Sequence, residues 1–469
     1  MDRKITVLCL LFLLVIWELH AQIGTVKGVV KSNGEGIEFV QVRIDSTTYG
    51  AITNSQGKFT IKNVPYGKHK ITASFVGYTR VQKELILSKT QPEAQLNFEL
   101  TETIMELEHI VITATKTPKR QTDSPVIVNV INSQTLDNVQ ACNLSEGLKF
   151  QPGLRVETDC QTCNYTQLRM NGLAGGYSQI LVNGRPIFSP LTGLYGMEQL
   201  PTSMIDRIEV VRGGGSSLYG SSAIGGTVNV ITKIPKKKGY ELNYTYQNID
   251  GQTNDNTISG NATLVSKSKK SGISFFLNHR NRDFYDANGD NFSEIPKIKN
   301  TAFGTSMFLL PRENQKLELS ISYIDEYRFG GEMITNQPAY VAKQSEERTH
   351  RVWMASADYQ INFNNDNSSL ISYLAWQNTD RDHYTGILPD EGTVEYARFM
   401  ENPPYGTSLV STYNLGLQVN HKLNNFLGGK NVLTLGTEYL YDDVLDEIAA
   451  YRYLIDQTTT DYGLFLQSD

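Results

Sequence analysis

The side chains best suited to binding a metal ion lie in a polar stretch beyond the middle of the sequence. Asp286, Asn288 and Asp290 place side-chain oxygens at every second position, and Glu294 follows. Oxygen ligands at this spacing suit calcium. The stretch departs from an EF-hand loop, because Gly289 stands at its fourth position and Glu294 comes at the ninth. Two interpretations stay open: a calcium loop and a solvated turn rich in Asp and Asn.

A glycine-rich run invites comparison with phosphate-binding loops. Gly215 and Gly220 have the spacing of a nucleotide-binding loop, but Ser221 stands where that motif requires Lys. The run from Gly213 to Leu218 also lacks the last glycine of the dinucleotide fingerprint. The chain contains no His-Glu-x-x-His, His-x-x-Glu or Gly-x-Ser-x-Gly sequence. We therefore expect no nucleotide site and no enzyme.

The first residues have the composition of an export signal. Arg3 and Lys4 precede an apolar run from Ile5 to Trp17, and Ala21 supplies a small residue for a leader peptidase. The run is short for a helix that crosses a bilayer core of about 30 Å, so we expect residues 1–21 to be a cleaved signal peptide. Because no later stretch has the roughly 18 apolar residues of a spanning helix, a membrane-spanning mature chain must use β-strands.

Three cysteines lie beyond the expected signal peptide, and two of them, Cys160 and Cys163, are separated only by Gln-Thr. A zinc site would need two more ligands, and no histidine lies near them in the sequence. A thioredoxin-like redox pair would need a βαβ setting that this sequence does not offer. For an exported chain we therefore expect a structural disulfide. Cys142 then stays unpaired, and we expect it to be buried as a small hydrophobe.

The composition favours a β-protein that does not bind nucleic acid. The 469 residues include 25 Tyr and 38 Gly and carry a formal charge of −6, without a basic stripe. Residues 22–103 alternate short β-prone runs with turn signals, a spacing that predicts a small antiparallel sandwich of about seven strands. This block resembles the carboxypeptidase-regulatory-like domain through Gly28-Val-Val, Asn54-Ser-Gln-Gly-Lys-Phe and Gly77-Tyr78.

Residues 107–235 are the most informative part of the sequence. A β-prone segment that ends at Pro118 would offer its unpaired backbone groups to a free strand edge. An expected strand and two short helices capped by Ser133 and Asn143 follow it. Four further pieces come in order: Gln167-Leu-Arg-Met-Asn-Gly172, Ile180-Leu-Val-Asn-Gly-Arg-Pro186, Ile205-Asp-Arg-Ile-Glu-Val-Val-Arg-Gly213 and Ser217-Leu-Tyr-Gly-Ser-Ser-Ala-Ile-Gly-Gly-Thr-Val-Asn-Val-Ile-Thr232. The ordered set closely resembles the plug domain of TonB-dependent outer-membrane receptors.

The resemblance assigns roles to particular residues. It implies a TonB box, which a periplasmic TonB protein would bind by strand addition. It implies that Arg207, Glu209 and Arg212 face the inside of a surrounding barrel. It also places the turn between Cys160 and Cys163 near a ligand, so that the disulfide would stiffen a ligand-binding loop that carries Tyr165, with Tyr177 as a second contact. The alternative is a disulfide that stabilises the turn without a ligand nearby. The TonB box comprises His109, Ile110, Val111, Ile112, Thr113 and Ala114.

Residues 236–469 consist of alternating β-segments separated by polar loops of unequal length. One apolar and one polar face suit a strand between lipid and a wet lumen, and the plug ahead of them favours a transmembrane β-barrel. We count about ten segments, whereas plugged transporters have about 22 strands. Ten strands cannot close around a plug of this size, so we expect a truncated or incomplete chain. The longest polar insertions are residues 280–300, 330–349 and 380–406.

The expected fold class is therefore mainly β: a small sandwich, an α+β plug and the first part of an antiparallel transmembrane barrel. The resemblance implies an outer-membrane receptor for TonB-energised uptake of a scarce small ligand, such as an iron chelate, haem or cobalamin. The expected partners are TonB with its inner-membrane complex, the ligand and the outer membrane, without a cofactor other than calcium. The alternative is a surface binding or adhesion protein that recruits a partner through its sandwich domain.

Overall fold

The chain forms two compact units, residues 1–109 and 110–469. They are described here from a computed structural model. No helix among the described residues is long and apolar enough to cross a membrane. The described residues are 23–32, 34–45, 47–75, 78–101, 110–158, 166–186, 193–235, 238–426 and 429–469.

The first unit is a β-sandwich with a single apolar core. One sheet has the order β2-β1-β5, with β8 and β9 also pairing with β1, and the other has the order β4-β3-β6-β7. Alternate residues of the strands point inward, as in the regular burial alternation of β1. The strands are β1 (Ile23–Ser32), β2 (Glu35–Gly36), β3 (Gln41–Ile44), β4 (Gly50–Ile52), β5 (Lys58–Pro65), β6 (Gly67–Ser74), β7 (Val81–Leu87), β8 (Glu93–Gln95) and β9 (Phe98–Glu99).

The sandwich differs from the expected one in two respects. Its sheets are not purely antiparallel, because β8 and β9 run parallel to β1. The sequence predicts a strand from Phe39 to Ile44, but β3 begins only at Gln41, since Phe39 lies in a turn with a φ of 63°. That conformation is strained for a bulky side chain.

The plug is built on a four-stranded mixed sheet of order β12-β16-β17-β15. Its core includes Leu136, Leu148, Ile208 and Val230, which are fully or almost fully buried. The elements from Ile110 onward are β10 (Ile110–Val111), β11 (Lys119–Arg120), η1 (Gln121–Asp123), β12 (Val128–Asn132), α2 (Ser133–Asn138), α3 (Leu144–Leu148), β13 (Leu154–Thr158), β14 (Thr166–Met170), η2 (Gly175–Tyr177), β15 (Ser178–Val182), α4 (Gly193–Gln199), η3 (Thr202–Met204), β16 (Ile205–Arg212), α5 (Ser216–Tyr219), η4 (Ser221–Ala223) and β17 (Gly226–Thr232).

The short plug helices begin at side-chain caps. Asn143 caps α3 as expected, since its side chain accepts a hydrogen bond from the Glu146 amide. The expected cap of α2 was wrong by one residue: Asn132, not Ser133, accepts the hydrogen bond of the Thr135 amide. Both residues can act as caps, and the extended backbone of Asn132 decides between them.

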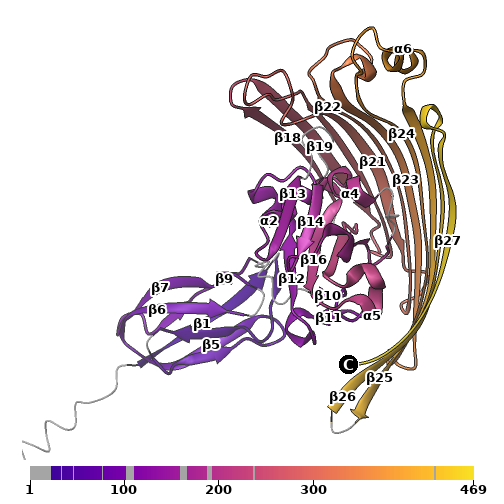
Figure 1. The fold of residues 1–469 in the computed structure, drawn as a ribbon. Helices are drawn as coiled ribbons and strands as arrows, with labels where there is room; N and C mark the ends of the chain where they lie inside the picture. Colours follow the sequence, from indigo (N-terminus) through magenta and orange to yellow (C-terminus); the bar gives the residue numbers. More distant parts are fainter. Residues whose placement is uncertain are drawn as a thin grey trace, which may run out of the picture. The chain divides into compact units, whose positions relative to one another are not determined.

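A ten-stranded antiparallel sheet follows, in which each strand pairs with its sequence neighbours. Figure 1 shows it as a curved wall with the plug on its concave side. The strands lengthen from 11 residues in β18 to 22 in β25. They are β18 (Gly239–Ile249), β19 (Thr253–Val265), β20 (Ser271–Arg282), β21 (Lys297–Leu309), β22 (Gln315–Gly331), β23 (Gln344–Phe363), β24 (Ser368–Ile387), β25 (Tyr405–Phe426), β26 (Gly429–Ile448) and β27 (Tyr453–Ser468), with η5 (Ala339–Val341), α6 (Val394–Glu401) and η6 (Ala449–Tyr451) between strands.

The two faces of the wall differ in polarity. Large apolar side chains on the outer face are exposed, among them Leu242, Ile321 and Leu464. Residues of the opposite face, such as Glu326 and Asn414, are polar and buried. This is the alternation that a strand between lipid and a polar interior requires.

The long connections all lie at one end of the wall, because successive hairpins alternate between its two ends. They are shorter than the expected insertions, covering only 283–296, 332–343 and 388–404. The other residues of the expected insertions belong to the strands on either side of each connection. Arg280, Arg348 and Arg381, which we assigned to polar loops, lie in strands with their side chains nearly buried.

Candidate functional site

The described part of the expected TonB box, residues 110–114, is docked on the plug. Ile110 and Val111 form β10, which pairs antiparallel with β11. Figure 1 places both strands next to α5. Burial alternates along the segment: Ile110 is 57% exposed, whereas Val111 and Thr113 are each 1% exposed. His109, the first residue of the expected box, lies outside the described residues.

One carboxylate holds this segment. Oε2 of Glu209, on β16, accepts hydrogen bonds from the amides of Ile112 and Thr113 at 2.9 and 3.0 Å and from the Thr113 hydroxyl at 2.6 Å. Glu209 is completely buried. A hydrogen bond to a charged group contributes about 1.5–3 kcal/mol, and an amide left without its acceptor on burial costs a similar amount. Glu209 is therefore the main polar tie between the segment and the sheet.

Three other plug side chains complete the contact. Arg207 donates to the Ile110 carbonyl at 3.0 Å and pairs with Glu209 at 2.8 Å. The Tyr219 hydroxyl donates to the Thr113 carbonyl at 2.9 Å, and Asn229 donates to the Thr113 hydroxyl at 3.0 Å. Both amide groups and carbonyl groups in the backbone of residues 110–113 are thus hydrogen-bonded to plug side chains.

The structure gives Arg207 and Glu209 contacts inside the plug, whereas the expected contact of Arg207, Glu209 and Arg212 with a surrounding barrel stays a prediction. The contacts of Arg207 and Glu209 among the described residues are with residues 110–113 and within the plug, not with the wall. Arg212, the last residue of β16, has an exposed side chain, and the guanidinium lies against Gly153. The spacing of the motif predicts that these residues share a strand, but not which neighbour their side chains meet.

Lys116 joins the end of the same segment to the wall. Its ammonium group pairs with Glu438 of β26 and lies 5.0 Å from the ring centre of Tyr219 and 4.4 Å from that of Phe465. Gln418 donates to the Lys116 carbonyl at 3.0 Å. Burial lowers the pKa of Lys116, and the Glu438 carboxylate opposes that shift. No motif or periodicity in the sequence indicates this contact between Lys116 and the wall.

Further ion pairs connect the plug and the wall. Arg280 of β20 binds Glu146 of the plug at 2.8 Å and Asp255 of β19 at 2.6 Å. Arg328 of β22 pairs with Glu198 of α4. Burial raises the pKa of Glu198, but the Arg328 guanidinium and the hydrogen bond from Thr166 together lower it more, so that the pKa lies below its usual range.

Polar and apolar side chains lie together where β15 ends. Arg185 pairs with Asp358 and lies 3.7 Å from the centre of the Tyr373 ring. Beside it, a cavity of about 60 Å³ separates plug and wall. Hydroxyl side chains line much of it, including Ser274, Ser320 and Ser356. The described seam thus combines ion pairs and hydroxyl groups, which water can replace, with an apolar part in which Val352 and Met354 of the wall join the buried core of the plug.

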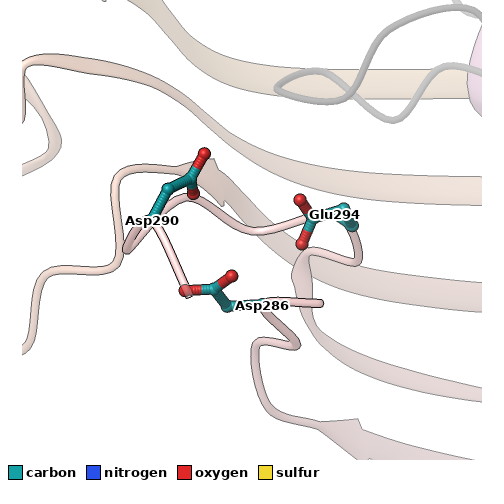
Figure 2. A group of neighbouring side chains, drawn as sticks. All are labelled: Asp286, Asp290 and Glu294. Atoms are coloured by element: carbon teal, nitrogen blue, oxygen red, sulfur yellow. The ribbon is translucent and has the colours of Figure 1, made fainter. Parts of the chain in front are cut away.

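The expected calcium ligands lie in the connection between β20 and β21. Oxygen atoms of Asp286, Asp290 and Glu294 lie within 4.8 Å of one another. Figure 2 shows the three side chains on this connection. The Asp286 carboxylate accepts hydrogen bonds from the amides of Gly289 and Asn291 at 2.7 and 2.8 Å. The Asn288 side chain donates to Asp290 at 3.1 Å. These bonds are typical of an Asx-rich turn. Calcium binding stays a prediction.

The other expected site residues are only partly described. Cys160, Cys163 and Tyr165 lie outside the described residues. Tyr177 is 47% exposed, at the end of η2. Cys142 is a buried free cysteine, and its sulfur accepts a hydrogen bond from Thr257 of the wall at 3.6 Å. Burial raises the pKa of this thiol.

Two family models match the chain. Residues 120–227 match the TonB-dependent receptor plug domain. The chain carries a TonB-dependent receptor plug. Residues 26–112 match the CarboxypepD_reg-like domain. With the antiparallel ten-stranded sheet, these matches confirm the expected fold class and the expected resemblance to TonB-dependent outer-membrane receptors that carry a carboxypeptidase-regulatory-like domain at their front.

Curated relatives match a little over a quarter of the chain. The vitamin B12 transporter BtuB of Vibrio cholerae is 32% identical over 126 residues, which are 27% of this chain and 21% of the relative. An iron-regulated outer membrane virulence protein of the same species is 35% identical over 133 residues, 27% of this chain and 20% of the relative. The matched part is thus about a fifth of each relative's length. The family and these relatives place the chain in the outer membrane.

Solved structures share the fold over a longer part of the chain. The ferripyoverdine receptor of Pseudomonas aeruginosa superposes with a TM-score of 0.60 at 13% identity, covering 83% of this chain and 58% of that receptor. The siderophore receptor PirA of Acinetobacter baumannii gives a TM-score of 0.55 at 19% identity, over 69% of this chain and 49% of its own. The chain thus spans roughly half the length of these receptors.

Proposed function

We propose that this chain acts in TonB-energised uptake of a scarce small ligand across the outer membrane. The observation that carries the proposal is the docked segment at residues 110–113. It is a short β-segment of the kind that a partner binds by strand addition, and polar side chains rather than a continuous sheet hold it on the plug.

The seam between plug and wall supports the same function. The pairs of Arg280 with Glu146 and Arg328 with Glu198 connect elements that would have to separate for a ligand to pass. Water can substitute for such polar contacts during movement, whereas a dry apolar seam would have to expose its surface at once. A pull on residues 110–113 would reach this seam through Lys116.

The ligand class follows from the relatives and remains part of the proposal. Those named above are called a vitamin B12 transporter, an iron-regulated outer membrane protein and siderophore receptors. We therefore propose an iron chelate, haem or cobalamin as the ligand, bound at the end of the wall that carries the long connections.

The test is ligand accumulation in cells whose only receptor of this class is the product of the gene that encodes this chain. Radiolabelled cobalamin, haem and ferric chelates are supplied in turn, with TonB present or deleted and with or without a proton-gradient uncoupler. We expect one of these ligands to accumulate only when both TonB and the gradient are intact. Equal cell-associated ligand in all conditions would contradict import and favour a surface binding protein.

A further inference from the structure

The three long connections of the wall, residues 283–296, 332–343 and 388–404, place apolar side chains on its outer face. We propose that together they form one fixed collar on that face and do not act as a lid over the concave side of the wall. A ligand would then reach the concave side without any movement of these connections. The collar itself goes beyond the proposed function, and only this consequence for ligand entry rests on it.

The base of the collar is a row of four side chains at the outer ends of β22 to β25. Cross-strand pairing places them next to one another in the order Phe329, Glu347, Tyr384 and Tyr405. Because Phe329 and Ile321 are an even number of positions apart in β22, their side chains share one face. The row therefore continues the outer face of the wall, on which Ile321 is exposed.

Each connection contributes an aromatic side chain that packs on this row or beside it. Phe284, from the first connection, lies edge-on to Phe329, with ring centres 5.4 Å apart. Tyr340, from the second connection, meets Tyr405 with ring centres 6.3 Å apart. Phe399 of α6, in the third connection, packs against the same cluster. The collar thus has an apolar core of its own on the outer face.

Backbone hydrogen bonds also join each connection to the next. The Met333 amide donates to the Asn291 carbonyl at 2.8 Å and so links the second connection to the first. The Leu388 amide donates to the Lys343 carbonyl at 2.9 Å and so links the third connection to the second. The three connections are therefore tied in series and share one apolar core, as expected for a single cooperative unit.

Tyr384 shows how tightly this core is packed. Its side chain is completely buried, and its hydroxyl has no hydrogen-bond partner among the residues that the structure describes. A Cβ on Gly386 would overlap that hydroxyl. A buried hydroxyl without a partner is unfavourable, so the packing of the surrounding rings must outweigh it. Lifting the connections would expose these rings to water, which holds the collar in place.

The first experiment asks whether the three connections open together. Hydrogen exchange is measured in the full chain in detergent at the amides of Ser293, Met333 and Ala397, one in each connection. We expect Tyr384→Ala to accelerate exchange at all three amides about tenfold or more, because it removes a ring from the shared core. Trp376→Ala is the matched control: it removes a larger ring from the same face of β24, farther from the collar, and should leave all three rates unchanged.

The second experiment asks whether the collar lifts from the wall in the resting protein. Ala339 is 1% exposed within the core of the collar, whereas Val394, at the start of α6, is 62% exposed. Maleimide labelling of Ala339→Cys and Val394→Cys is compared with that of the chain without an added cysteine. We expect Ala339→Cys to react about a hundredfold more slowly than Val394→Cys, and Tyr384→Ala to remove most of that difference.

Either experiment can overturn the collar. Exchange that rises in only one connection, or in none, after Tyr384→Ala would show three separate loops. Equal labelling of Ala339→Cys and Val394→Cys would show connections that lift freely, as a lid does. If Tyr384→Ala does not fold, as judged by gel mobility with and without heating, Phe284→Ala takes its place and should accelerate exchange at Ala397 as well as at Ser293.

Neither experiment uses a ligand or TonB, so the collar and the proposed function can fail separately. A receptor that shows the collar in both measurements but imports none of the radiolabelled ligands would contradict the proposed function alone.

Discussion

At the scale of single residues, Cys142 tests the contact between plug and wall. Its thiol is buried beside Thr257, and burial raises its pKa, so that the unreactive neutral thiol predominates near neutral pH. In a chain with Cys160→Ser and Cys163→Ser, we expect thiol reagents to label Cys142 at least tenfold more slowly in the folded protein than in denaturant. Equal rates would show that the plug does not seal against β19.

Asp286 leads to a pH prediction for the outer loop. Burial tends to raise its pKa, but backbone amides, including that of Gly289, lower it more, so the folded pKa lies below the unfolded one. The carboxylate therefore supports the loop above the unfolded value of about 3.9, and this support is lost as the pH falls through the lower folded value. We expect hydrogen exchange at Gly289, corrected for intrinsic rate, to lose protection only below about pH 4.

Two variants test whether the charged Asp286 carboxylate stabilises the loop. Asp286→Ala should remove the protection of the loop already at neutral pH, whereas Asp283→Ala, which removes an exposed carboxylate paired with Lys297, should not. Titration with calcium addresses the second interpretation of the same loop. If calcium increases protection from hydrogen exchange in the wild type but not in Asp286→Ala, the loop binds calcium. If calcium leaves the exchange of the wild type unchanged, the loop is only a turn rich in Asp and Asn.

The residue scale also shows what a sequence can and cannot predict here. The β-prone residues 110–114 and the strand that carries Arg207 and Glu209 are visible in the sequence, because alternation and composition determine them locally. Their contact is not visible, since it joins residues almost a hundred positions apart. For the same reason, nothing in the sequence indicates that Lys116 meets Glu438.

At the scale of elements, the wall strands test which face meets lipid. On β22, Ile321 lies near a row of stacked rings formed by Phe303, Tyr323 and Trp353, with centroids 5.5 and 4.7 Å apart. Ile321→Arg puts a charge into this apolar face and should destabilise the folded form by about 2–4 kcal/mol. We expect a corresponding loss of folded protein in the outer membrane, measured by gel mobility with and without heating.

Asp325 provides the matched control on the same face of the same strand, closer to its outer end. Asp325→Arg introduces the same side chain at a polar position beside Tyr323 and should cost about 0–1 kcal/mol. If the two variants were equally stable, the outer face of β22 would not lie in lipid.

Strand periodicity explains why the element count was predictable and the loop boundaries were not. Apolar residues at every second position indicate each strand, and the ten expected segments correspond to the ten strands of the wall. Near the outer end, however, the strands carry polar residues on both faces, as at Arg348 and Arg351. Such residues have the composition of a loop, so the sequence assigns Arg280 and Arg381 to connections that in fact begin later.

At the scale of the whole molecule, two kinds of contact have to be reconciled. The plug sheet packs around an apolar core, with Ile208 and Val230 fully buried, and is therefore a stable body. Its connection to the wall combines ion pairs, such as that of Arg280 with Glu146, with an apolar contact in which Val352 and Met354 of the wall join the buried core of the plug. A pull should accordingly disturb the seam before the plug itself, which is the behaviour that the proposed uptake requires.

The most direct test is a proline at Ile112, the residue whose amide is bound by Glu209 in the docked state. Proline removes that amide and prevents continuous strand pairing, whereas Ile112→Ala keeps it. We expect cells with Ile112→Pro to bind the radiolabelled ligand at their surface as well as the wild type does but to accumulate none inside, while Ile112→Ala still accumulates it. Normal accumulation by a correctly folded Ile112→Pro receptor would contradict energised uptake through this segment.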